Sequence, residues 1–187
     1  MLVGNYSRKC KDSKGGIKSV WLLSWKQYSR SQVVTVENTV VTFPQSFVYK
    51  FESVSSVNVE EKMNENEGGK YYEQSLTMSF KSDWSRDFDK LLNKDYRILT
   101  LDNNGLYRIL GLWKGLECKK IDFKTGGAKG EMNGYTFTLE GQEEKQSYFI
   151  NNPFSNGFIE DNSYYLLLQN SDNILTQNSD KIIYRNG

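Results

Sequence analysis

The stretch YRILTLDNNGLYRILGLW, residues 96–113, is the clearest folding signal in the chain. Its two runs of recurring apolar residues are separated by Asn104-Gly105, a dipeptide that accepts the positive φ angles of a tight hairpin turn. The alternation of Tyr107 and Arg108 with apolar residues is assigned to core packing and not to an RNA-binding strand. The stretch holds no histidine and no nucleophile beside a base. We therefore expect a scaffolding hairpin here and not a catalytic site.

Strand-like segments lie on both sides of this hairpin. Residues 17–25 (IKSVWLLSW) predict a strand with a buried centre, and residues 32–43 (QVVTVENTVVTF) predict one or two short strands before a break at Pro44. Residues 116–123 (LECKKIDF) and 135–141 (YTFTLEG) predict two more strands, joined by a glycine-containing loop. The chain of 187 residues has only two prolines and is 14% aromatic, which favours a mainly β fold.

A long hairpin is expected over residues 47–80. In its second half one face carries Tyr72, Gln74, Leu76, Met78 and Phe80, and the other carries Tyr71, Glu73, Ser75, Thr77 and Ser79. The connecting residues 61–69 (EKMNENEGG) are polar and acidic and end in two glycines, which predicts a large exposed loop. The face rich in hydroxyls and carboxylates is either an ordinary solvated sheet face or the lining of a wet channel.

One amphipathic helix is expected at about residues 83–94. Ser82 or Asp83 can cap its first turn, and acidic residues at that end suit the helix dipole. The apolar stripe consists of Trp84, Phe88, Leu91 and Leu92. The acidic residues Asp83, Asp87 and Asp89 lie away from this stripe, which indicates a solvated helix face and not a metal site.

The two ends of the chain differ from its centre in composition. Residues 1–16 are polar and basic and end in glycines, which predicts an N-terminal arm that is mobile or ordered by a partner. Residues 17–150 form the expected core domain. Residues 151–187 are rich in Asn and Ser with short apolar runs, which predicts a C-terminal extension of two or three small strands. This extension should lie on the main domain or on a neighbouring subunit.

Charge and cysteine content indicate the compartment. Lys and Arg number 24 against 23 Asp and Glu, so no net charge draws the protein to nucleic acid or to a membrane. Cys10 and Cys118 are distant in sequence; a single disulfide is the alternative to the favoured interpretation, two free thiols in a reducing compartment. Neither a secretory signal nor a membrane-spanning apolar run occurs, so we expect a soluble protein made in a cytoplasm.

Residue types that carry catalysis are scarce. Histidine is absent, which removes the commonest general base and metal ligand. The carboxylate pairs Glu60/Glu61 and Glu143/Glu144 are assigned to hydrophilic loops, where nothing would separate their pKa values. No ligand cluster has zinc or calcium spacing, and no P-loop motif follows the loop glycines. We therefore predict a protein without enzymatic activity, cofactor or metal. An enzyme that uses Cys118 or carboxylates is a more distant hypothesis, after the two binding or structural functions given below.

The order of these elements resembles a known protein family. The long hairpin ending in YYEQSLTMSF (71–80), one helix, the hairpin LDNNGLYRILG (101–111) and the closing strand GEMNGYTFTLEG (130–141) follow the plan of tail tube proteins of long-tailed bacteriophages. Together with GGIKSVWLLSW (15–25), these motifs also resemble structural proteins from phages of Bacteroides and related gut bacteria, crAss-like phages included. The resemblance covers about residues 10–150 and implies an antiparallel β-sandwich or partial barrel with one helix.

The resemblance also implies a role. It points to a ring-forming virion protein of the tail or neck, expected to be a hexamer or a dodecamer, that surrounds the path of the viral DNA. The face bearing Glu73, Ser75, Thr77 and Ser79 would line the channel without gripping DNA phosphates. The loop formed by Met63, Asn64, Glu65, Asn66, Glu67, Gly68 and Gly69 would reach an adjacent ring. Other tail, neck or portal proteins are the implied partners, no membrane is involved, and tail tube, neck ring and tail hub stay open.

A surface-binding β-sandwich is the alternative function. It would be a virion decoration protein or a carbohydrate-binding module, and its contact residues would be Trp21, Trp25 and Trp113. These tryptophans lie in apolar runs, which favours core positions over exposed ones.

Overall fold

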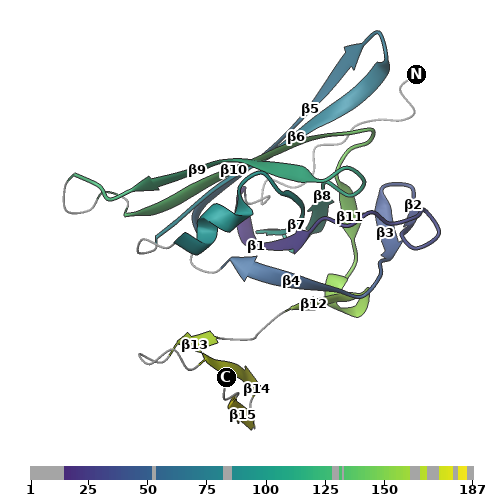
Figure 1. Cartoon of the computed structure of the whole chain (residues 1–187). Helices are drawn as coiled ribbons and strands as arrows, with labels where there is room; N and C mark the ends of the chain where they lie inside the picture. The colour runs from purple at the N-terminus through teal and green to yellow at the C-terminus, as the bar shows by residue number, and fades with distance from the viewer. Residues whose placement is uncertain are drawn as a thin grey trace.

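The computed structural model describes residues 15–51, 54–81, 86–127, 131, 133–160, 165–167, 173–178 and 181–184. Residues 1–14 of the expected N-terminal arm and the expected helix caps Ser82 and Asp83 lie outside this part of the chain. Strands dominate the described residues (Figure 1). The prediction of a mainly β fold is therefore confirmed.

The elements follow one another along the chain with short connections. The strands are β1 (Ile17–Ser24), β2 (Val34–Val36), β3 (Thr39–Thr42), β4 (Ser46–Phe51), β5 (Val54–Asn66), β6 (Gly69–Lys81), β7 (Asp95–Asp102), β8 (Tyr107–Leu110), β9 (Leu116–Lys124), β10 (Gly134–Glu143), β11 (Tyr148–Ile150), β12 (Phe158–Glu160), β13 (Tyr165–Leu167), β14 (Asn173–Asn178) and β15 (Lys181–Tyr184). Two short 3₁₀ helices, η1 (Arg86–Leu91) and η2 (Pro153–Ser155), complete the described structure.

Twelve of the strands form a single branched sheet. Its main path runs β2-β3-β11-β8-β7-β9-β10-β6-β5, while β1 pairs with β7, β4 with β1, and β12 with β4. The expected antiparallel sandwich or partial barrel is corrected to one large mixed sheet, because β11 pairs with β3, and β12 with β4, in parallel. Both parallel strands return from far along the chain, and such long connections are what parallel pairing requires. Strands β13, β14 and β15 form a separate antiparallel sheet.

The branch lies between β8 and β9, which pair with the same strand, β7. Strand β8 pairs with residues 98–101 of β7, and β9 pairs with Asp95 and Tyr96. The connecting bend, residues 111–115, is closed by a hydrogen bond from the Gly115 N–H to the Gly111 carbonyl (3.2 Å). Gly111 has φ +64°, and a Cβ there would lie 2.5 Å from the Leu116 side chain, so only glycine fits.

The central strands β1 and β7 are buried on both faces. In β1, Val20 and Leu22 point into one apolar core, while Trp21 and Leu23 point into a second. The first core is completed by β6, β9, β10 and Leu110 of β8, and the second by β3, β4, β11, β12 and Ile109 of β8. Burial on both faces explains why these strands read as nearly continuous apolar runs in the sequence.

The β5–β6 hairpin differs from the expected long loop. The strands continue to Asn66 and start again at Gly69, so Glu67 and Gly68 alone form the turn. Strand β10 accompanies β6 only as far as Tyr72, and the rest of the hairpin, residues 64–71, is paired only with itself among the described residues. This two-stranded arm projects from the body of the molecule (Figure 1). Paired backbone amides hold these polar residues in strands, although their composition is typical of a loop.

The expected helix at 83–94 is also corrected. Within residues 86–94, the part of this segment that the structure describes, the helical residues are the six of the 3₁₀ helix η1. Phe88 and Leu91 pack on the first core as predicted, but Leu92 is exposed. The Asn93 N–H donates to the Cys118 carbonyl, and the Cys118 N–H donates to the Lys94 carbonyl. The chain is therefore already bonded to β9 at the point where the last helical turn was expected.

The hairpin at Asn104-Gly105 is present, but its turn is longer than predicted. Strand β7 ends at Asp102 and β8 begins at Tyr107, and only Gly105 has a positive φ (+82°). The Asp102 carboxylate oxygen Oδ1 accepts hydrogen bonds from the N–H groups of Asn104 (2.8 Å) and Leu106 (2.9 Å). The Asp102 side chain thus bonds two backbone N–H groups of the turn, so a four-residue connection is stabilised in place of the two-residue turn that was predicted.

The first part of the expected C-terminal extension lies on the core. Pro153 of η2 is buried, and Phe158 of β12 is 1% exposed and stacks on Phe43 with ring centroids 4.5 Å apart. Pro153 and Phe158, both placed in the expected extension, are therefore buried against the core in the described structure.

The first core predicts a sharp contrast between two adjacent residues of β10. Phe137 is 1% exposed and packs on the rings of Phe51, Phe80 and Phe88, whereas Thr138 lies on the opposite, solvated face. We expect Phe137→Ala to lower the free energy of unfolding by about 3–5 kcal/mol and Thr138→Ala to change it by less than about 0.5 kcal/mol. Urea denaturation measures both, and equal losses in the two variants would contradict the assigned strand faces.

Candidate functional site: the polar face of β5, β6, β9 and β10

Four neighbouring strands present one continuous polar face opposite the first core. The residues predicted to line a channel, Glu73, Ser75, Thr77 and Ser79, all belong to it. Across from them lie Gln142, Glu140, Thr138 and Thr136 of β10, and Lys62, Glu60, Asn58 and Ser56 of β5. Their neighbours Gln74, Leu76, Met78 and Phe80 are buried, so the alternation read from the sequence is present in the structure.

The face has a hydroxyl-rich centre and a charged end. Ser79 and Thr136 contact each other through their hydroxyl oxygens at 2.9 Å. Farther along the strands, Glu60, Ser75 and Glu140 lie side by side in register. Water can hydrogen-bond to these solvated hydroxyls and carboxylates, so they need no partner within the protein. What this polar face offers is therefore a wet, weakly interacting surface and not a tight binding site.

The charged end is hollowed into a groove of about 610 Å³. The groove's charged lining consists of the carboxylates Glu60, Glu73, Asp95, Glu117 and Glu140 and the ammonium groups of Lys62, Lys114 and Lys119. Five negative and three positive groups leave a formal charge of −2 in the groove. Ser75 also lines it, so two of the four predicted channel residues lie in the groove and two lie beyond it.

The charges of the groove are paired loosely. A hydrogen bond from Asn58 (2.9 Å) and the nearby Lys62 ammonium (3.3 Å) lower the pKa of Glu60. A hydrogen bond to Glu117 raises the pKa of Lys119. All these side chains are solvated, and such pairs contribute little to stability. Both shifts favour the ionised forms of these two groups, the Glu60 carboxylate and the Lys119 ammonium.

The residues predicted to reach a neighbouring ring form the end of the same hairpin. Met63, Asn64, Glu65 and Asn66 are the last residues of β5, Glu67 and Gly68 form the turn, and Gly69 starts β6. Met63 is 59% exposed, and Asn66 accepts a hydrogen bond from the Gly68 N–H (2.9 Å). The groove and the arm thus share β5 and β6, with the groove at the base of the arm.

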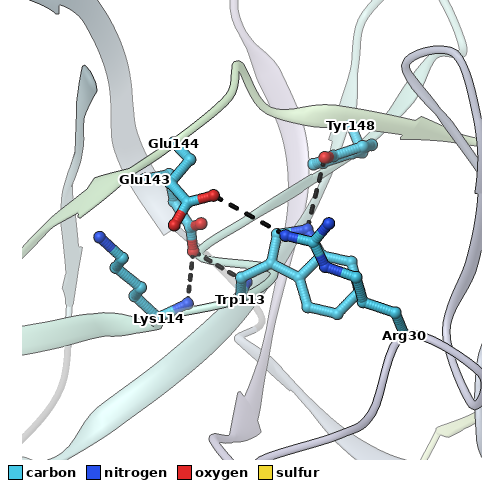
Figure 2. A network of polar contacts seen from close by, with 6 residues as sticks. All are labelled: Arg30, Trp113, Lys114, Glu143, Glu144 and Tyr148. Carbon is cyan, nitrogen blue, oxygen red and sulfur yellow. Dashed lines mark hydrogen bonds and ion pairs between the residues drawn. The ribbon is translucent and has the colours of Figure 1, made fainter. Parts of the chain in front are cut away.

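A buried polar cluster beneath the groove was missed from the sequence. Gln74 Oε1 accepts from the Gly111 N–H (2.9 Å), and Arg97 Nε donates to the Leu112 carbonyl (2.8 Å). Glu143 Oε1 accepts from the N–H groups of Trp113 (2.9 Å) and Lys114 (2.7 Å) (Figure 2). The three side chains, 1–2% exposed, bond four consecutive residues of the 111–115 bend. We call Gln74, Arg97 and Glu143 the bend clamp.

The loop assignment is wrong for Glu60, Glu61 and Glu143, whereas Glu144 does lie in the connection between β10 and β11. Glu60 and Glu61 lie within β5, and Glu61 accepts hydrogen bonds from Gln74 Nε2 (3.0 Å) and the Ser147 N–H (2.7 Å). Glu143 ends β10 in the interior, while Glu144 is exposed. Burial raises the pKa of Glu143 above its ordinary value, against the lowering effect of its backbone hydrogen bonds. Glu143 and Glu144 therefore differ in environment, one buried and one solvated, which two neighbouring residues in a hydrophilic loop would not.

Arg97 is the least expected member of the bend clamp. Its Nη2 donates to the Lys26 carbonyl (2.7 Å), and its guanidinium lies 4.8 Å from the Tyr28 ring centroid and 5.7 Å from that of Phe43. Burial lowers the pKa of Arg97 to about 10, opposed by its interactions with Tyr28 and Glu143. At neutral pH it stays charged. The sequence signal for the cluster was a polar residue at a core position: Gln74 in the buried row of β6, and Arg97 within YRILTL.

Cys118 does not have the environment of an activated thiol. It is free and buried in β9, and burial raises its pKa to about 11. A reactive cysteine has a lowered pKa and access to solvent. Within the described ranges, no group of three or more acidic, cysteine or histidine side chains is placed to hold a metal ion. The described residues also include no helix long and apolar enough to cross a membrane.

Comparison of the chain with protein-family models, with curated protein sequences and with solved structures finds no match. The fold and the polar face are therefore the observations on which function can be argued.

The buried carboxylate of the bend clamp predicts a pH effect on stability. Because its pKa is raised in the folded state, folded Glu143 keeps a proton that the unfolded chain loses above about pH 4.5. Its contribution to stability is complete below that pH and is lost as the pH rises through the folded pKa. We expect the unfolding free energy of the wild type, relative to that of Glu143→Gln, to decrease from pH 4 to pH 8, because glutamine does not titrate. Parallel urea-denaturation profiles over this range would contradict a buried, titrating Glu143.

Proposed function

We propose that this protein is a structural virion subunit of a tailed bacteriophage that forms a ring in the tail or neck around the path of the DNA. The observation that carries the proposal is the polar face of β5, β6, β9 and β10, which ends in an acidic groove and is bounded by an unshared strand edge. The proposal is supported by three features of the β5–β6 hairpin: its residues line the solvated groove, the outer edge of β5 is unpaired among the described residues, and residues 64–71 project as an arm.

The edge of β5 favours association with another copy. This strand has thirteen residues, and in the described chain it pairs only with β6, at the end of the sheet. A long edge with free N–H and C=O groups is a template for pairing with another strand. Identical subunits arranged about an axis would extend the four-stranded face from one copy to the next and satisfy these groups.

The charge of the groove suits a DNA channel that must not hold its contents. The formal charge of −2 repels phosphates, and the hydroxyl-rich centre offers no cluster of Lys or Arg for salt-dependent phosphate binding. Glu73, Ser75, Thr77 and Ser79 would therefore face the lumen. Other tail, neck or portal proteins would stack on the ring, and the arm at residues 64–71 would reach the nearest one.

Assembly tests the proposal directly. We expect the purified protein at high concentration to form closed rings by negative-stain electron microscopy and a single large species by analytical ultracentrifugation. A variant in which Asn-Gly replaces residues 64–71 should still form rings but lose ring-to-ring stacking, because these residues pair only with one another. Leu106→Ser, an exposed change in the β7–β8 turn, is the control and should stack like wild type. A protein that stays monomeric at every concentration tested would contradict the proposal.

DNA retention tests the orientation of the polar face. Glu73→Lys removes one negative and adds one positive charge, which changes the groove from −2 to 0. We expect rings of this variant to retain short double-stranded DNA at low salt and release it at high salt. Wild-type rings and the matched surface variant Glu37→Lys, in the turn after β2, should retain none. Equal retention by Glu37→Lys and Glu73→Lys rings would show that the polar face does not line the lumen.

A further inference from the structure

A second pocket borders the 111–115 bend at Trp113 and shares no lining residue with the acidic groove. Its volume is about 260 Å³, and the side chains around it include Arg30, Thr35, Trp113, Glu144, Lys145 and Tyr148. These come from three separate parts of the chain: residues 30–35, which run into β2, the bend, and residues 144–148, which lead from β10 to the first residue of β11. None of them belongs to the polar face proposed to line a channel.

The tryptophan of this pocket is held in place at three atoms. Its N–H donates to buried Glu143 (2.9 Å), its indole N–H donates to the Tyr148 hydroxyl (3.3 Å), and its carbonyl accepts from the Trp25 indole (3.2 Å). Figure 2 shows the first two of these bonds. Two of the three bonds hold the Trp113 backbone and one orients its indole, so the ring is a pre-organised platform that loses little conformational freedom when a ligand binds. Of the three tryptophans weighed from the sequence, Trp21 is buried at 4% exposure, whereas Trp113 borders this pocket.

Arg30 covers the platform loosely. Its guanidinium carbon lies 5.8 Å from the Trp113 ring centroid, and Nη2 lies 3.9 Å from Glu144 Oε2 (Figure 2). The side chains of Arg30 and Glu144 are 85% and 68% exposed. A solvated ion pair at this distance is weak, so both groups can turn towards an incoming ligand at little cost.

The chemistry of the pocket defines the ligand class. An aromatic ring offers an apolar surface, Arg30 and Lys145 offer donors, Glu144 offers acceptors, and the Thr35 hydroxyl offers both. A sugar ring matches this set, because one of its faces is apolar and its hydroxyl groups both donate and accept. The two basic groups and one acidic group give a formal charge of +1, which disfavours a cationic ligand and admits a neutral or acidic sugar. The volume is slightly below the range of drug-sized sites, about 300–1,000 Å³, so one ring fits.

We propose that this pocket binds a single saccharide ring, neutral or acidic, stacked on Trp113 and hydrogen-bonded by Arg30 and Glu144. The site is independent of ring assembly, since it uses none of the residues of the polar face or of the arm. A free monosaccharide and the terminal residue of a polysaccharide would present the same chemistry to it.

The test is a titration of the full-length protein with glucose, galactose, N-acetylglucosamine and glucuronate, followed by tryptophan fluorescence and by NMR chemical shifts. We expect saturable binding of at least one sugar with a Kd on the order of 1 mM and a loss of at least about tenfold in affinity in Trp113→Ala, equivalent to about 1.4 kcal/mol. Trp113→Phe keeps an aromatic platform and should bind more tightly than Trp113→Ala, which separates lost stacking from lost folding.

A matched arginine pair controls for general effects of charge. Arg30→Ala should weaken binding, most for glucuronate. Arg108→Ala removes another surface guanidinium, 4.9 Å from the Phe149 ring centroid and outside the pocket, and should leave binding unchanged. No saturable response to any of the four sugars, or equal weakening by Arg30→Ala and Arg108→Ala, would overturn the proposal. Either result would leave the ring assembly of the chain unaffected.

Discussion

The hydrogen bonds of the bend clamp are the interaction on which the rest of the structure depends. Gln74, Arg97 and Glu143 bond the backbone of residues 111–114 from three different strands. Without them, the polar groups of an irregular segment would be buried and unpaired, at a cost of about 1–3 kcal/mol each. With them, β8 can stop and β9 can leave β7 in a new direction. The sheet then divides into two branches, each covering one core.

The branching also separates the two surfaces to which functions are assigned. One branch carries the polar face, the acidic groove and the arm, and the other carries the Trp113 pocket. Glu143 supports both surfaces from the interior, since its carboxylate accepts hydrogen bonds from the N–H groups of Lys114, which lines the groove, and Trp113, which lines the pocket. A rigid bend between the two surfaces lets each keep its own chemistry: acidic and hydroxyl-rich on one side, aromatic and slightly basic on the other.

Much of the fold could be predicted from local patterns. Alternation placed the buried and solvated faces of β6, and the apolar centre of β1 was evident from VWLL, because side-chain direction in a strand follows from residue spacing alone. The errors came where local composition and tertiary pairing disagree. Residues 61–66 have a loop's composition but are held as strand by pairing with β6, and residues 83–94 have a helical stripe but are shortened by bonds to β9.

The amino-acid sequence by itself determined the mainly β class, the strand faces and the row that holds Glu73, Ser75, Thr77 and Ser79. Only the tertiary structure decided that Gln74, Arg97 and Glu143 meet, since they lie in three strands that are distant along the chain. It also decided that Glu143 is buried while Glu144 is exposed, although the two are adjacent in a polar stretch. The physical reason is that spacing dictates the direction of a side chain within its own strand, whereas burial and pKa depend on which other strands pack over it.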